Sequence, residues 1–79
     1  MIELLLVFRG AGDVITGERK LLDAGVDALS TPAPKTISSG CGVCLRVNSV
    51  DIDRARLLLG ETILGVYFEN GEDFALWIP

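Results

Sequence analysis

The sequence contains no histidine. Without an imidazole, the chain cannot build the Cys–His pair that activates the nucleophile of cysteine hydrolases. It has only two cysteines, and a structural zinc site takes four ligands, so four thiolates would require two subunits side by side. We therefore expect no metal and no cofactor in this chain.

Basic residues are also few. Seven lysines and arginines stand against eleven aspartates and glutamates, which gives a net charge of −4. The basic residues form no cluster of the kind that binds phosphate backbones, so we expect no nucleic-acid partner. No apolar run is long enough to span a membrane, and the N-terminus lacks the features of a signal peptide. A cytoplasmic protein is expected, and cysteines in that reducing compartment are more often reactive than structural.

The length and composition predict one small globular domain over residues 1–79. Hydrophobic residues make up 49% of the chain, a proportion that argues against disorder. A domain of this size buries about 60–65% of the surface that its unfolded chain exposes. Its core is therefore expected to be small.

Alternating and helical periodicities predict seven elements. They are a strand at 2–8, a helix at 13–24, strands at 26–30 and 42–47, a helix at 48–59, and strands at 62–69 and 73–78. Glu3 is the one polar residue of the first strand, which is typical of a central strand. Asp13 is expected to cap the first helix and Gly25 to end it. Asn70 and Gly71 predict a hairpin between the last two strands.

Glycines near the first helix have two predicted meanings. Gly17 lies inside the helix, where glycine costs about 1 kcal/mol relative to alanine, and a close approach of the helix to the sheet would explain it. Gly10 and Gly12 follow the first strand. They lack both the Gly-x-Gly-x-x-Gly spacing and the Lys-Ser/Thr ending of phosphate-binding loops, so no phosphate site is expected there.

The order βαββαβ with an added C-terminal strand is the ferredoxin-like α+β pattern. It predicts an antiparallel sheet with both helices on one face. The other face would carry Leu5, Val7 and Cys44, which is unusually apolar for a surface that faces solvent. Exposing such a patch is unfavourable by roughly 25 cal/mol per Å². We therefore expect a symmetric homodimer that covers part of it.

The chemistry is expected between Thr31 and Val47, where Cys41 and Cys44 stand in a C-x-x-C spacing. Cys41 lies where a loop of small polar residues meets an apolar strand. Small residues let backbone N–H groups approach a sulfur, and several such groups stabilise an anion. A nearby cation favours the thiolate further. The candidate site therefore comprises Cys41 and the residues around it: Lys35, Ser38, Ser39, Gly40, Gly42 and Arg46.

The roles of the two cysteines stay open on these grounds. Cys41 could instead be a small residue that fills the edge of a strand. In a regular strand, residues 41 and 44 would point to opposite faces, so they can meet only if Cys41 still belongs to the loop. Cys44 is then either a resolving thiol or metal ligand, or a small buried hydrophobic residue.

At this segment the chain resembles a family of small domains named putative selenium/sulfur carrier protein-like. The resemblance covers roughly residues 2–68 and rests on a Thr-Pro-basic run that continues into Ile-Ser-x-x-Cys-Gly and an apolar strand with an arginine. The matching residues are Thr31, Pro32, Pro34, Lys35, Ile37, Ser38, Ser39, Gly40, Cys41, Gly42, Leu45 and Arg46. The resemblance implies that Cys41 is the carrier thiol, with the basic and serine residues as its surroundings. It does not extend to a role for Cys44.

The resulting hypothesis is a carrier or adaptor rather than a turnover enzyme. Cys41 would hold sulfur or selenium as a persulfide or selenopersulfide, received from a donor protein and passed to an acceptor protein. One alternative is a thiol-redox protein that cycles Cys41 and Cys44. Another is a non-catalytic interaction or metal-binding module.

Overall fold

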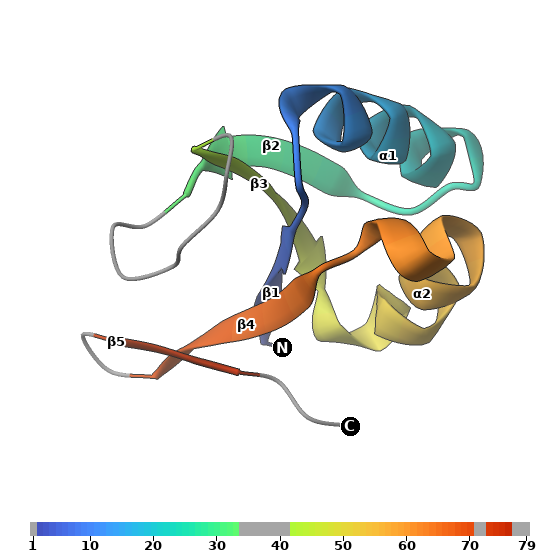
Figure 1. Ribbon diagram of the computed structural model, residues 1–79. Helices are drawn as coiled ribbons and strands as arrows, with labels where there is room; N and C mark the ends of the chain where they lie inside the picture. The colour runs from blue at the N-terminus through green and yellow to red at the C-terminus, as the bar shows by residue number, and fades with distance from the viewer. Residues whose placement is uncertain (1, 34–41, 71–72, 77–79) are drawn as a thin grey trace.

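The computed structural model describes residues 2–33, 42–70 and 73–76. The elements in chain order are β1 (Glu3–Val7), α1 (Ala11–Asp23), β2 (Ala28–Pro32), β3 (Val43–Asn48), the 3-10 turn η1 (Ser49–Asp51), α2 (Ile52–Leu59), the 3-10 turn η2 (Gly60–Thr62), β4 (Gly65–Asn70) and β5 (Asp73–Leu76). The strands form one antiparallel sheet in the order β2-β3-β1-β4-β5. Both helices lie on the same side of the sheet (Figure 1). The predicted ferredoxin-like α+β fold with an added C-terminal strand is confirmed.

The main core lies between the sheet and the two helices. It consists of the buried side chains of Leu4, Leu6, Phe8, Val14, Leu21, Val26, Leu45, Val47, Ile52, Ala55, Leu59 and Val66. Gly17 of α1 faces this core, and a Cβ atom on it would stand 3.3 Å from Leu59 Cδ1 and 3.4 Å from Leu45 Cδ1. The close approach predicted from the helical glycine is confirmed.

The C-terminal end of α1 is a Schellman motif at Gly25, which has a φ of 81°. Gly25 donates its N–H to the carbonyl of Leu22 at 3.0 Å, and Val26 donates to that of Leu21 at 2.9 Å. The predicted helix stop is therefore confirmed. Because Val26 is used in this motif, the second strand runs over Ala28–Pro32 rather than over residues 26–30 as predicted.

The predicted cap at the start of α1 is wrong. The helix begins at Ala11, with Gly10 as its N-cap and without a side-chain capping bond. The carbonyl of Gly10 instead accepts the N–H of Asp13 at 3.1 Å. Asp13 thus lies in the first turn, where the helix dipole favours an acidic side chain.

Two further elements begin at least three residues later than predicted. α2 begins at Ile52, after a 3-10 turn, rather than at residue 48. β4 begins at Gly65 rather than at Thr62. The Thr62 hydroxyl donates to the carbonyl of Leu59 at 2.7 Å, which holds this segment in a 3-10 turn at the end of the helix.

The predicted C-terminal hairpin is present. β4 and β5 pair from Tyr67 opposite Leu76 to Asn70 opposite Asp73. Asn70 is therefore the last residue of β4, and the connecting residues 71–72 lie outside the described part of the chain.

The helix-free face of the sheet carries a second apolar cluster, formed by Leu5, Val7 and Cys44 with Ala33 and Tyr67 packed against it. Within the single chain, Leu5 is 4% exposed and Val7 is 3% exposed. The expectation that these two side chains face solvent is wrong, because the chain buries them itself. Leu5 and Val7 therefore do not contribute to an exposed patch that a homodimer would cover, and the homodimer stays a prediction.

Candidate functional site

The described part of the predicted site is the base of the β2–β3 hairpin. Ala33 donates its N–H to the carbonyl of Gly42 at 2.9 Å. This bond extends the ladder by one pair beyond Pro32 and Val43. Ala33 and Gly42 flank residues 34–41, so this bond joins the residues on either side of that segment. The predicted site residues Lys35, Ser38, Ser39, Gly40 and Cys41 all belong to that segment and lie outside the described residues.

Gly42 interrupts the strand geometry at this base. Its φ is 70°, in the left-handed region that favours glycine, and the regular β3 strand begins only at Val43. The alternation of side chains between the two faces therefore cannot be continued from Cys44 back across Gly42. The argument that places the two cysteines on opposite faces of a regular strand does not apply here.

Cys44 is enclosed in the apolar cluster of the helix-free face. It is 0% exposed and lies opposite Val7 in β1 and Thr31 in β2. This position agrees with the small buried hydrophobic residue that the sequence left as one option. Thiol exchange requires an accessible sulfur, so Cys44 could react only after local opening of the sheet face.

Tyr67, which packs against the cluster that contains Cys44, and Gly65 beside it were not identified from the sequence. A Cβ atom on Gly65 would stand 3.1 Å from Cε1 of Tyr67, so the tyrosine ring lies over the glycine two residues before it. The same ring packs against the cluster that contains Cys44. The sequence pattern that could have predicted this contact is a glycine followed two residues later by an aromatic residue in the same strand.

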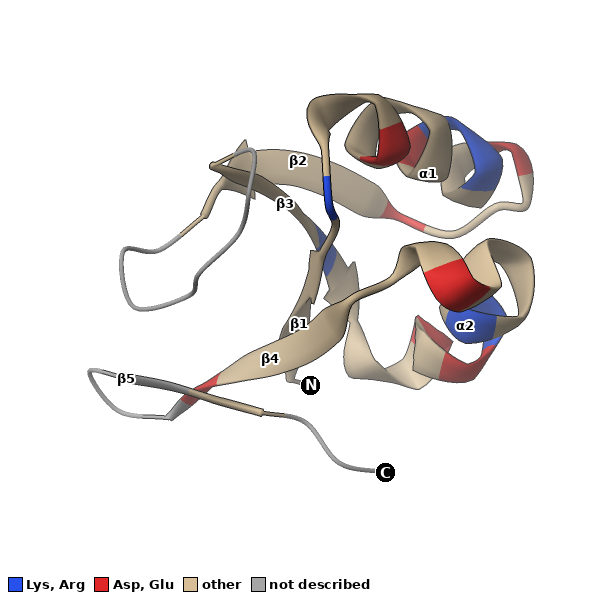
Figure 2. Cartoon of the chain, in the orientation of Figure 1, with Lys and Arg blue, Asp and Glu red and all other residues tan. Residues whose placement is uncertain are grey.

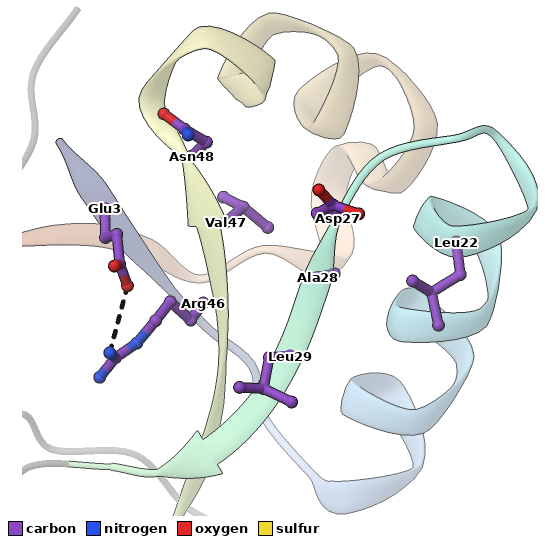
Figure 3. A pocket seen from close by; sticks show the side chains of 8 residues that line it. All are labelled: Glu3, Leu22, Asp27, Ala28, Leu29, Arg46, Val47 and Asn48. Carbon is purple, nitrogen blue, oxygen red and sulfur yellow. Dashed lines mark ion pairs between the residues drawn. The ribbon is translucent and has the colours of Figure 1, made fainter. Parts of the chain in front are cut away.

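Arg46 is paired with a carboxylate rather than with the hairpin base. Its Nη1 atom lies 3.1 Å from Oε2 of Glu3, with the two side chains 48% and 60% exposed. Figure 3 shows the two side chains reaching toward each other from β3 and β1. At about 3.3 Å per residue, Arg46 lies roughly 13 Å along the strand from Gly42. Its predicted role beside the thiol stays a prediction, and Glu3 was not foreseen as its partner.

A shallow cavity of about 270 Å³ opens beside this ion pair, between α1, β2 and β3 (Figure 3). Its walls are Glu3, Leu22, Asp27, Ala28, Leu29, Arg46, Val47 and Asn48. The Oδ1 atom of Asn48 is buried there without a hydrogen-bond partner. A second cavity, also of about 270 Å³, is lined by Arg9, Asp13, Glu61, Thr62 and Leu64.

Charge and metal-binding groups are dispersed over the described residues. Figure 2 shows lysines and arginines on both helices, on β3 and between β1 and α1 rather than in one patch. Within residues 2–33, 42–70 and 73–76, histidine, cysteine, aspartate and glutamate side chains form no group of three or more that could hold a metal ion. No helix among them is long and apolar enough to cross a membrane.

Comparison with known proteins identifies the family of this chain. Residues 3–69 match the family described as "Putative Se/S carrier protein-like". The chain belongs to this family. The match confirms the resemblance inferred from the sequence; it includes the whole segment from Thr31 to Val47 and ends before β5. No curated protein and no solved structure matches the chain.

In this member of the Se/S carrier-like family, Cys44 is described by the structure and Cys41 lies outside the described residues. Cys44 is a buried residue of β3, in the apolar cluster against which Tyr67 and Ala33 pack. Cys41 precedes the glycine at which the strand geometry ends.

Proposed function

We propose that this protein is a carrier that holds sulfur or selenium on Cys41 and passes it to an acceptor protein. The observation that carries the proposal is the family match over residues 3–69, which contains the Cys41–Gly42 motif. Support from the sequence comes from the small residues around Cys41 and from Lys35, which favour a thiolate. Ser38, Ser39, Gly40, Gly42 and Arg46 complete the proposed surroundings.

The proposed loading step is an exchange without net oxidation. The Cys41 thiolate attacks the terminal sulfur of a donor persulfide, R–S–SH, and forms a new S–S bond. The donor's S–S bond breaks at the same time, and its thiolate R–S⁻ leaves. Cys41 then carries the persulfide, and an acceptor thiolate repeats the exchange. A selenium atom in the terminal position would be transferred in the same way.

A single-thiol carrier is favoured over the dithiol alternative by the burial of Cys44. A resolving thiol must reach the sulfur that it attacks, and Cys44 is 0% exposed. The proposal therefore gives Cys44 a packing role. A donor protein, an acceptor protein, a second copy of the chain and a cytoplasmic location belong to the same proposal.

Mass spectrometry of loaded variants tests the proposal. The protein is treated with a desulfurase and cysteine, and each peptide is examined for the added mass of one sulfur atom. Wild type and Cys44→Ala should carry the persulfide on Cys41, whereas Cys41→Ser should carry none. Alanine is the preferred control at position 44 because serine would bury a hydroxyl group in the apolar cluster.

Two outcomes would contradict the assignment. Equal loading of Cys41→Ser and Cys44→Ala would show that Cys41 is not the carrier thiol. Loading that requires both cysteines and ends in an internal disulfide would support the redox alternative instead.

A further inference from the structure

β2 is one of the two edge strands of the sheet, and its hydrogen-bonding pattern fixes which groups face outward. Ala33 donates to Gly42 across the hairpin. In an antiparallel ladder every second residue is bonded to the partner strand, so the N–H groups of Leu29 and Thr31 also face β3. The backbone positions of the alternate residues, Ala28, Ser30 and Pro32, therefore face away from the sheet.

Two of these three outward positions offer no N–H group to another strand. The amide of Ser30 donates to Oε2 of Glu18 at 2.9 Å. Glu18 belongs to α1, which runs alongside β2 (Figure 1). Pro32 has no N–H group at all. A further strand placed against this edge would thus lack most of the donors that it needs.

The surroundings of this edge would otherwise favour association. Leu29 of β2 is 64% exposed, and Ile15 and Leu22 of α1 are 63% and 52% exposed. Ile15 and Leu22 are three and four residues from Glu18, so all three lie on one side of the helix. Leu22 and Leu29 line the same cavity (Figure 3). An edge strand flanked by exposed apolar side chains is prone to pair with another chain.

We propose that Glu18 prevents the β2 edge from pairing with the β2 edge of a second copy of this chain. A second copy is the matching occupant because antiparallel pairing about a two-fold axis would bring identical edges together. It would also place the two Leu22–Leu29 surfaces near each other. Glu18 occupies the Ser30 donor that such pairing would use, and Pro32 removes the next donor along the strand.

Glu18→Ala and Glu18→Gln form a matched pair for the test. Both variants lose the negative charge, but only glutamine keeps an oxygen that can accept the bond from Ser30. Amide exchange of Ser30, followed by NMR in dilute protein with reductant, reports the bond directly. Exchange in Glu18→Ala should be about tenfold faster than in wild type, and exchange in Glu18→Gln should stay much closer to wild type.

Sedimentation equilibrium over a range of concentrations then reports association, with reductant present to exclude disulfide-linked copies. Glu18→Ala should show a higher average mass than wild type and Glu18→Gln, and the double variant Glu18→Ala/Pro32→Ala a higher one still. Masses that do not differ among these chains would overturn the proposal. So would an unchanged Ser30 exchange rate in Glu18→Ala.

Discussion

Replacing Gly42 measures how much the left-handed backbone at this residue, next to Cys41 in the sequence, contributes to stability. Gly42 has a φ of 70°, and its carbonyl accepts the bond that closes the hairpin base. Among the described residues, no atom lies within 4 Å of the place where its Cβ would stand. A methyl group there therefore has room, and the effect of Gly42→Ala should come from the backbone alone.

The expected magnitude follows from two opposing terms. An L-residue in the left-handed region is disfavoured by about 1–2 kcal/mol. Alanine also restricts the unfolded chain, which stabilises the folded state by about 0.4–1 kcal/mol. Gly42→Ala should therefore lower the free energy of unfolding by about 1 kcal/mol. In a domain of this size that lowers the Tm by roughly 4–8 °C.

D-alanine in place of Gly42 supplies the decisive control. A D-residue favours positive φ, so it keeps the unfolded-state term without the strain. The chain can be assembled by ligation between Gly40 and Cys41, which allows either enantiomer of alanine to replace the glycine. Urea unfolding followed by circular dichroism should find the protein with D-alanine more stable than the protein with L-alanine by about 1–2 kcal/mol. Equal stability of the two, or greater stability of the L-form, would refute the reasoning.

Two further predictions concern packing and surface charge. Gly17→Ala should change the free energy of unfolding by less than about 1 kcal/mol, because the gain in helix propensity offsets the 3.3 Å contact with Leu59. Gly17→Leu should destabilise by about 2–3 kcal/mol in urea unfolding, because its further carbons meet a filled core; a leucine variant as stable as the alanine variant would contradict the packing. A double-mutant cycle of Glu3→Ala and Arg46→Ala should give a coupling below about 1 kcal/mol that vanishes at high salt, since both side chains are largely exposed. A larger coupling that persists in salt would show that the pair is more shielded than the structure indicates.

Much of the fold was readable from the sequence because periodicity reports which face of an element is buried. The alternation in β1 placed Leu4 and Leu6 against the helices and Leu5 and Val7 on the other face, as observed. Gly25 marked the end of α1 for a local reason, since the left-handed conformation favours glycine. The family was also readable, because its motif is a continuous run of residues.

The boundaries of the elements and the hydrogen-bond partners of individual residues could be predicted less well from the sequence. Val26 fits a strand pattern, but its N–H is bonded within the helix-capping motif, so β2 starts later. The bond from Ser30 to Glu18 joins residues twelve positions apart, and no local pattern announces it. Such contacts depend on how a helix lies against an edge strand, which is decided only when the layers pack.

Cys44 and Arg46 of β3 show the same difference between what is local and what is long-range. From the sequence alone, Cys44 and Arg46 are placed on one face of their strand, since side chains alternate with a period of two. That Cys44 is fully buried in an apolar cluster and that Arg46 pairs with Glu3 is seen only in the folded chain. Periodicity decides on which face of a strand a side chain lies. The side chains that it contacts on the adjacent strands depend on the register, which is set by long-range strand pairing.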